Sequence, residues 1–153
     1  MMPTSMSLFV PGKPEPKGSW NFYGKRVVAT NDKPLKIWTR DIQWLATANR
    51  NRACPVEKPI GVALGMRFVF MRPESHLKKN GTLRKGVSVL HLVKPDLDKL
   101  IRAVKDALSG VVYHDDSQVF KLLWEPTKEY ATGIEGPGLH LDMEFYDIDG
   151  VQI

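Results

Sequence analysis

The stretch from Lys94 to Val119 reads KPDLDKLIRAVKDALSGVVYHDDSQV and contains two pairs of aspartates separated by an amphipathic pattern. The apolar residues between the pairs fall on one helical face: Leu97, Leu100, Ile101, Val104 and Leu108. Gly110 then provides a typical helix stop, and a strand-like run follows from Val119. The start of the predicted helix can therefore carry the first pair, and the strand entry can return the second pair beside it.

The two pairs are Asp96 with Asp98 and Asp115 with Asp116. Carboxylates that are packed together repel one another unless a cation lies between them. Hard oxygen ligands suit Mg²⁺, which takes one or two carboxylates and keeps positions for water and phosphate. From the residues alone we expect a Mg²⁺-dependent phosphodiester site. The alternative is that the first pair is a helix N-cap and the second is an ordinary polar turn.

The whole pattern resembles the signature of the RusA-type Holliday junction resolvases, a family of DNA endonucleases common in phages and prophages. That signature reads approximately D-x-D-N-L-x-K-x-x-x-D-A-L-x-G, a short spacer, and D-D-x-Q. The matching residues are Asp96, Asp98, Leu100, Asp106, Ala107, Leu108, Gly110, Asp115, Asp116 and Gln118. The segment GKPEPKGSW at 12–20, with the basic loop that follows it, is similar to the phage branch, and the resemblance extends from about Leu8 to Phe145.

Two positions depart from this signature. The family usually has asparagine where this chain has Lys99, and lysine where this chain has Arg102. Arginine stays protonated and offers a rigid fork of donors, so Arg102 can steady a phosphate but cannot serve as a proton-transfer base. A surface ion pair with Asp98, one helical turn away, is the alternative role.

The resemblance implies a crossover junction endodeoxyribonuclease that resolves four-way junctions by paired symmetric nicks in DNA recombination and repair. Asp96, Asp98 and Asp116 would hold Mg²⁺, or Mn²⁺ in its place, with Asp115 assisting. Arg102, or Lys105 further along the helix, would stabilise charge in the transition state. Because a four-way junction needs two matched cuts, a homodimer is expected. The implied location is the cytoplasm of a bacterial cell or a phage-infected host.

Positive charge is concentrated in two connecting segments. Residues 13–36 hold six basic and two acidic side chains, residues 72–94 hold six and one, and residues 95–153 hold five and twelve. A polyanion would bind the first two segments and approach the acidic region only through a metal; solvated loops are the alternative. The predicted DNA contacts are Lys17, Trp20, Lys25, Arg26, Lys78, Lys79, Arg84, Lys85, Lys94, Lys99 and Lys105.

The conformation of each basic segment bears on how it would contact DNA. Residues 20–29 mix aromatic and basic side chains, which either stack on unpaired bases or form a short hairpin with its aromatics turned inward. The loop at 72–94 is expected to be mobile without DNA, because structureless loops of this length are typically functional or disordered.

The remaining pattern predicts a single α+β domain over residues 1–153. Strands are expected at 6–10, 60–70, 118–124 and 139–146, and a helix from about Asn31 to Asn51, besides the helix after Asp96. This order favours a two-layer sandwich, a mixed sheet with two main helices on one face, as in RusA. The small residues Gly61, Ala63 and Gly65 share one strand face, where we expect a helix to pack closely.

Other classes of protein fit less well. No apolar run reaches the ~20 residues of a membrane span, and the first residues lack the pattern of a signal peptide. The single cysteine, Cys54, fits a reducing cytoplasm. Two rival functions remain: a junction- or single-strand-binding recombination accessory without catalysis, and a metal-dependent nucleotide phosphatase, which would need a closed pocket instead of basic loops.

Overall fold

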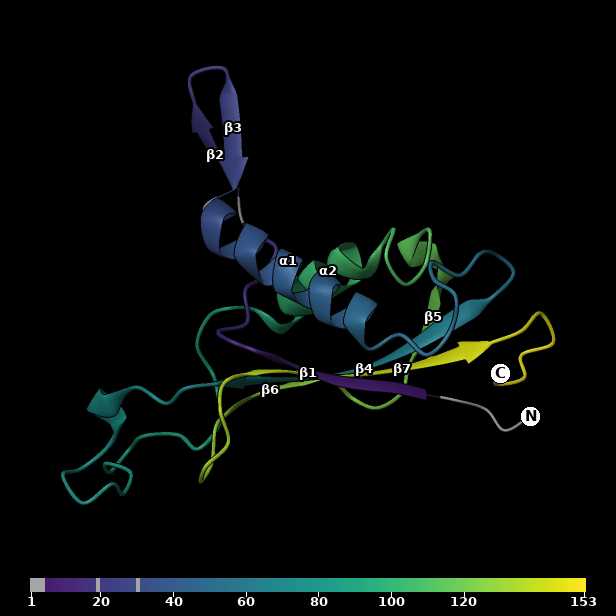
Figure 1. Ribbon diagram of the computed structural model, residues 1–153. Helices are drawn as coiled ribbons and strands as arrows, with labels where there is room; N and C mark the ends of the chain where they lie inside the picture. The colour runs from purple at the N-terminus through teal and green to yellow at the C-terminus, as the bar shows by residue number, and fades with distance from the viewer. Residues whose placement is uncertain (1–4, 19, 30) are drawn as a thin grey trace.

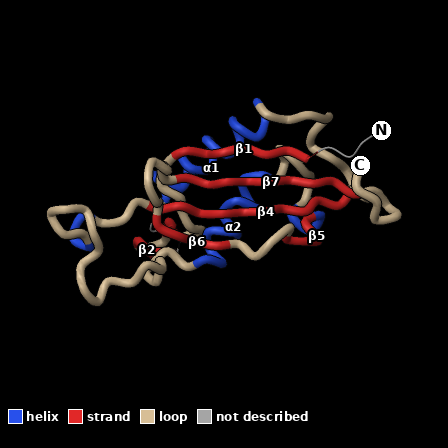
Figure 2. The backbone as a smooth tube through the Cα atoms, turned by 90° about the horizontal axis from the view of Figure 1, so that it is seen from below, coloured by secondary structure: helices blue, strands red, loops and turns tan. Residues whose placement is uncertain are grey.

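A five-stranded mixed sheet forms the centre of the computed structural model, which describes residues 5–18, 20–29 and 31–153, without the side chains of residues 20–23 and 27–29. Its strands are β1 (Ser5–Pro11), β4 (Gly61–Phe70), β5 (Val119–Leu122), β6 (Thr127–Tyr130) and β7 (Gly138–Tyr146). The order is β1-β7-β4-β5 (Figure 2). β5 pairs with the first half of β4, and β6 pairs with the second half of β4 along the same edge. β7 runs antiparallel to β1 and β4, whereas β5 and β6 run parallel to β4.

Two helices cover one face of this sheet, α1 (Asp32–Ala48) and α2 (Leu97–Leu108), as Figure 1 shows. The apolar stripe predicted for α2 meets the inward side chains of β4 and β7, and the fully buried members of this core include Leu64, Met66, Phe68, Leu100, Val104, Leu108, Leu141 and Met143. Burial of each such side chain stabilises the fold by about 1.5–3 kcal/mol. The predicted two-layer α+β architecture is confirmed.

The opposite face of β4 corrects one prediction, because no helix of the described chain packs on its small residues. Instead the aromatic side chains that follow Gln118 lie there. A Cβ atom at Gly61 would lie 2.9 Å from the ring of Phe120, and one at Gly65 would lie 2.4 Å from the indole of Trp124. The prediction that another element approaches these small residues closely is correct, but the approaching groups are the aromatic rings of Phe120 in β5 and Trp124 just after it.

Two element boundaries also differ from prediction. The strand expected over 118–124 ends at Leu122, and a separate strand, β6, forms beside the second half of β4. Sequence patterning missed β6 because it has only four residues, and its central pair, Lys128 and Glu129, is charged. α1 ends at Ala48, before the expected limit at Asn51. Neither described helix combines the length and apolarity that crossing a bilayer requires.

Two arms project from this body (Figure 1). The first is a hairpin of β2 (Trp20–Tyr23) and β3 (Arg26–Ala29), a two-stranded sheet separate from the main one. The second is the connection from β4 to α2, which contains the short 3-10 helix η1 (Glu74–His76) and an isolated bridge between Leu77 and Leu83. The mobility of the second arm stays a prediction.

Candidate active site

The polar side of α2 and the turn before β5 enclose a hollow of about 310 Å³. Its lining residues are Asp98, Ile101, Arg102, Lys105 and Asp116. Asp116 begins the 3-10 helix η2 (Asp116–Gln118), which leads directly into β5. One carboxylate from each predicted pair therefore reaches the same hollow, together with Arg102 and Lys105.

The buried side chain of Gln118 holds the second aspartate pair in place. Its amide nitrogen donates to the carbonyl oxygens of Val56 (3.0 Å) and Ile60 (3.1 Å). Its amide oxygen accepts from the backbone N–H groups of His114 (2.9 Å) and Asp115 (3.0 Å). Both donors and both lone pairs of the amide are in use. The glutamine of the D-D-x-Q motif is thus the residue that fixes the turn.

Asp115 and Asp116 have different surroundings. The Asp115 carboxylate accepts from the backbone N–H of Ser117 at 3.0 Å, which caps η2, and lies 3.9 Å from the Lys58 ammonium. These bonds to Ser117, followed by the nearby charge of Lys58, lower the pKa of the Asp115 carboxyl below its ordinary value. The polar-turn reading describes Asp115 well, whereas Asp116 lines the hollow; a metal-binding role for Asp115 stays a prediction.

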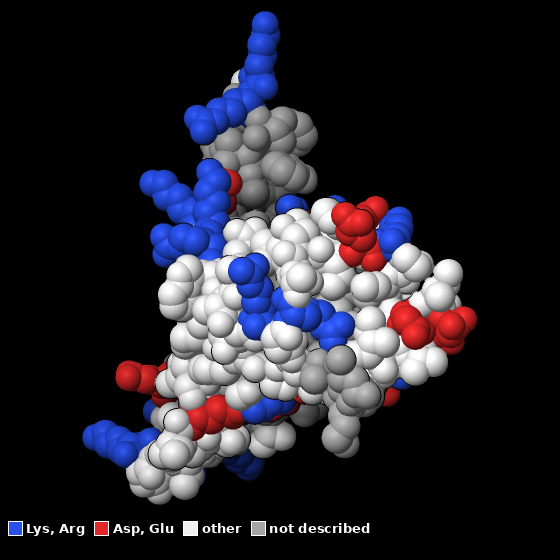
Figure 3. Space-filling view, turned by 45° about the vertical axis from the view of Figure 1, so that its right-hand side comes forward, with Lys and Arg blue, Asp and Glu red and all other residues white. Residues whose placement is uncertain are grey.

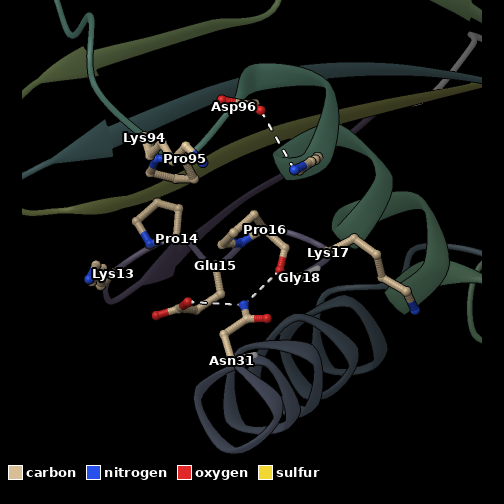
Figure 4. A pocket seen from close by; sticks show the side chains of 11 residues that line it. Lys13, Pro14, Glu15, Pro16, Lys17, Gly18, Asn31, Lys94, Pro95 and Asp96 are labelled. Atoms are coloured by element: carbon tan, nitrogen blue, oxygen red, sulfur yellow. Dashed lines mark hydrogen bonds and ion pairs between the residues drawn. The ribbon is translucent and has the colours of Figure 1, made fainter. Parts of the chain in front are cut away.

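The first pair is divided in a similar way. Asp96 occupies the N-cap position of α2, but its side chain makes no capping hydrogen bond. Its carboxylate instead lies 3.7 Å from the Lys99 ammonium and lines a second hollow at the start of the helix (Figure 4). The N-cap alternative therefore does not account for the Asp96 side chain, while Asp98 faces the hollow that contains Asp116.

A metal ligand set can be assessed from these positions. In the described part of the chain, no group of three or more Asp, Glu, His or Cys side chains is arranged to hold a metal ion. Asp98 and Asp116 lining one hollow provide two carboxylates, and this donor set fits Mg²⁺, which keeps several of its waters. The participation of Asp96 and Asp115 remains a prediction.

Lys128 of β6 fixes the backbone just before Asp96, a role that sequence analysis missed. Its ammonium donates to the carbonyl oxygens of Val93 (2.6 Å) and Pro95 (2.9 Å). A lysine on a four-residue strand gives no signal of such a contact, because its partners are main-chain atoms more than thirty residues away. The entry to α2 is thus held from the sheet.

The base of the second arm is anchored by an aromatic stack. The buried His91 ring lies 4.5 Å from the ring of Phe70 and 4.7 Å from that of Tyr130, centroid to centroid. The Arg72 guanidinium lies 4.0 Å from the Tyr130 centroid and donates to the carbonyl oxygens of Ser88 and Val89. Burial, followed by the charges of Lys128 and Arg72, lowers the pKa of His91.

Tyr113 joins the end of α2 to the turn that carries the second pair. Its hydroxyl donates to the carbonyl oxygen of Lys105 at 2.7 Å, and burial, followed by the charges of Asp116 and Asp106, raises its pKa. The phenol therefore stays protonated and keeps this bond at physiological pH.

The predicted DNA contacts are spread over the arms and the polar side of α2. Lys25 and Arg26 are exposed at the turn of the hairpin. On the second arm, the predicted contacts Lys78, Lys79, Arg84 and Lys85 are all exposed. Lys94 and Lys99 line the hollow beside Asp96, and Lys105 lines that of Asp98. The side chain of Trp20 lies outside the described part, so the question of base stacking stays open.

Lys17, another predicted DNA contact, has a structural partner on α2. Its ammonium lies 3.2 Å from the Asp106 carboxylate, and its backbone N–H donates to the Lys99 carbonyl oxygen at 2.9 Å. Asp106 of the D-A-L motif therefore binds the N-terminal loop to α2. Figure 3 shows Lys and Arg at the tip of the hairpin and beside its base, with Asp and Glu in separate patches of the same face.

The model of the family Endodeoxyribonuclease RusA matches residues 11–135, which is most of the chain. The chain belongs to the RusA endodeoxyribonuclease family. The RusA match includes both aspartate pairs and both arms, and it confirms the family that the sequence resembles; the phage branch stays a prediction. Comparison with curated proteins gives no match.

Proposed function

We propose that this RusA family member is a Mg²⁺-dependent, structure-selective endonuclease that resolves four-way DNA junctions by paired symmetric nicks. It would act as a homodimer in DNA recombination and repair, in the cytoplasm. The observation that carries the proposal is the hollow on α2 where Asp98 and Asp116 meet Arg102 and Lys105. Two carboxylates for a cation and two cations for a phosphate are the groups that phosphodiester hydrolysis needs.

Each charged residue of the hollow has a chemical role in this scheme. Asp98 and Asp116 would hold Mg²⁺, and Asp96 and Asp115 would assist them as further carboxylates. When bound, Mg²⁺ supplies a lowered pKa for the attacking water and offsets charge on the leaving 3′ oxygen. Arg102 and Lys105 stabilise the negative charge that develops on the non-bridging phosphate oxygens. Arg102 acts only as a donor, since its guanidinium stays protonated.

The two arms hold the DNA while the hollow acts on it. Both arms lead to the start of α2: the hairpin ends next to Asn31, which shares a hollow with Asp96, and the second arm runs directly into Lys94. Exposed lysines and arginines on the arms contact backbone phosphates, which gives affinity that falls with salt. Branched DNA offers backbones in several directions, and two separated arms suit such a shape.

The homodimer follows from the substrate. A four-way junction is nearly two-fold symmetric, and two copies related by a two-fold axis place two hollows in matching positions. Light scattering with and without junction DNA tests this part, and a monomer in both conditions would contradict it.

The function is tested by incubating the protein with a synthetic four-way junction and with linear duplex, with and without Mg²⁺. Paired nicks with 5′-phosphate and 3′-hydroxyl ends are expected in the junction alone, and none with Asp98→Asn. Asp142→Asn, a carboxylate on the sheet face away from the helices, is the matched control and retains cleavage. Tight junction binding without cleavage by any version would overturn the nuclease and leave the accessory role.

A further inference from the structure

A second hollow lies at the start of α2, next to the candidate active site and distinct from it. Its volume is about 330 Å³, within the range of small-molecule sites. Figure 4 shows the loop from Lys13 to Gly18 in the middle, the segment from Lys94 to Asp96 above it, and Asn31 below it. Three prolines, Pro14, Pro16 and Pro95, give it apolar walls, and lysines surround them.

The walls of this hollow are fixed by hydrogen bonds from three separate elements. The Asn31 amide at the start of α1 donates to the Pro16 carbonyl oxygen at 2.8 Å. The Lys17 N–H donates to the Lys99 carbonyl oxygen of α2 at 2.9 Å. Lys128 of β6 holds the Pro95 carbonyl oxygen at 2.9 Å. The hollow is therefore preformed, and a ligand would not have to order these segments on binding.

The charge inside the hollow is unbalanced. Its carboxylates already have partners: Asp96 lies 3.7 Å from the Lys99 ammonium, and Glu15 accepts from the Asn31 amide at 3.4 Å. Within the described residues, Lys13 and Lys94 line the hollow and form no ion pair. Two ammonium groups above proline walls match a ligand that joins an anionic group to a compact, partly apolar body.

The hollow and the candidate active site are lined by neighbouring turns of α2. Lys99 lines this hollow and Arg102 lines the other, three residues further along α2. At 1.5 Å per residue that is about 4.5 Å along the helix axis, close to the ~3.4 Å that separates nucleotides along one strand of a duplex. A strand that presents one phosphate to Arg102 therefore brings a neighbouring phosphate towards Lys99 and the hollow that it lines.

We infer that this hollow is a subsite for the phosphate and sugar of a single nucleotide, next to the bond that is cut. Lys13 and Lys94 hold its phosphate, and the three prolines pack against its sugar. The inference rests on the proposed function for its ligand, a DNA strand. The subsite sets the register of that strand on α2, so that the next phosphate lies over Asp98 and Asp116.

The test measures binding of a four-way junction to Asp98→Asn protein without metal, by fluorescence anisotropy, so that no cleavage is required. Single phosphates around the expected nick are replaced one at a time by uncharged methylphosphonates. At one or two linkages the replacement is expected to weaken binding about fivefold. In protein that also carries Lys13→Ala and Lys94→Ala, the same replacement should weaken binding less than about twofold, because the lysines that contact that phosphate are already absent. The salt slope of the double variant falls by about two.

The matched control is Arg50→Ala with Lys121→Ala, which removes two charges that line neither hollow. This control keeps the fivefold sensitivity at the same linkages. Equal sensitivity in the Lys13→Ala, Lys94→Ala protein at every linkage scanned would overturn the subsite. If wild-type protein cuts junctions but the coupling is absent, the nuclease stands and the subsite fails. If the coupling is present but no version cuts, the subsite stands and the nuclease fails.

Discussion

The two aspartate pairs reach the same part of the molecule by different means. Asp115 and Asp116 lie in a turn that Gln118, two residues further on, fixes through four hydrogen bonds. Asp96 and Asp98 begin a helix whose entry depends on Lys128, a side chain from another strand. The second pair is thus encoded by its own neighbours in sequence, and the first depends on a contact across the fold.

Within each pair, one carboxylate faces the hollow and the other binds a lysine. Asp98 and Asp116 line the hollow, while Asp96 lies near Lys99 and Asp115 near Lys58. This difference teaches that the two carboxylates of the motif D-x-D, like those of the motif D-D, are not equivalent in their surroundings. It also ranks the four residues for experiment.

The largest effect is expected for Asp116→Asn compared with Asp115→Asn. Asp116→Asn should lower kcat for junction cleavage about 10³-fold or more, because a metal ligand contributes several kcal/mol and each 1.36 kcal/mol is a factor of ten. Asp115→Asn should lower it at least tenfold less. Single-turnover cleavage rates measure both, and equal losses would contradict the division within the pair.

Loss of the Gln118 side chain should lower the stability of the folded chain. Gln118→Ala removes a buried amide and leaves two part-buried N–H groups and two carbonyl oxygens without their partner, which should lower the free energy of unfolding by about 2–4 kcal/mol. Gln43→Ala is the matched control, because that amide makes one described bond, to the Ala107 carbonyl oxygen, and should cost about 1 kcal/mol. Urea denaturation measures both, and a smaller loss for Gln118→Ala than for Gln43→Ala would refute its role.

Lys128→Met should affect the first pair alone. The methionine keeps the length of the side chain but cannot donate to Val93 and Pro95, so Asp96 loses its fixed position. The Mg²⁺ concentration for half-maximal cleavage should rise about tenfold, as for other residues that orient metal ligands. Junction binding without metal should change little, and Lys121→Met on β5 is the control. An unchanged Mg²⁺ requirement would mean that Asp96 needs no such support.

The smallest effect is expected for pH and His91. Because the pKa of His91 is lowered in the folded chain, the unfolded chain binds its proton first as pH falls below about 6.5. Stability from the neutral ring is present above that value and is lost on acidification. Thermal melting at pH 7.5 and 5.5 should show a larger decrease for the wild type than for His91→Phe, which keeps the stack. Equal decreases would exclude His91 as the source.

The sequence predicted the helices and the mixed sheet because apolar periodicity reports burial directly. Leu100, Val104 and Leu108 follow the helical period and are fully buried. The same logic placed Asp98 and Arg102 on one side of α2, where both line the hollow. The structural role of Gln118 could have been predicted, because a capping residue, here Asp115, followed three residues later by glutamine is the sequence pattern of a capping box.

The contacts that sequence reasoning missed are made between side chains and distant backbone. Lys128 was counted only as a charge, and its bonds to Val93 and Pro95 depend on β6 pairing with β4, which no local pattern predicts. The same holds for Lys17, whose partner, Asp106, is on another element. Strand register and sheet topology determine such contacts, and neither can be predicted from a few consecutive residues of sequence.

The placement of the arms has a consequence for how such nucleases diverge. Each arm lies in a connection, one between β1 and α1 and the other between β4 and α2, and neither adds a strand to the main sheet. Insertions or deletions beyond Arg72 and before His91, or within the hairpin, leave the core and the hollow on α2 in place. On the proposed function, a change in arm length would alter which branched structures bind, while the residues of the hollow on α2 would keep their positions.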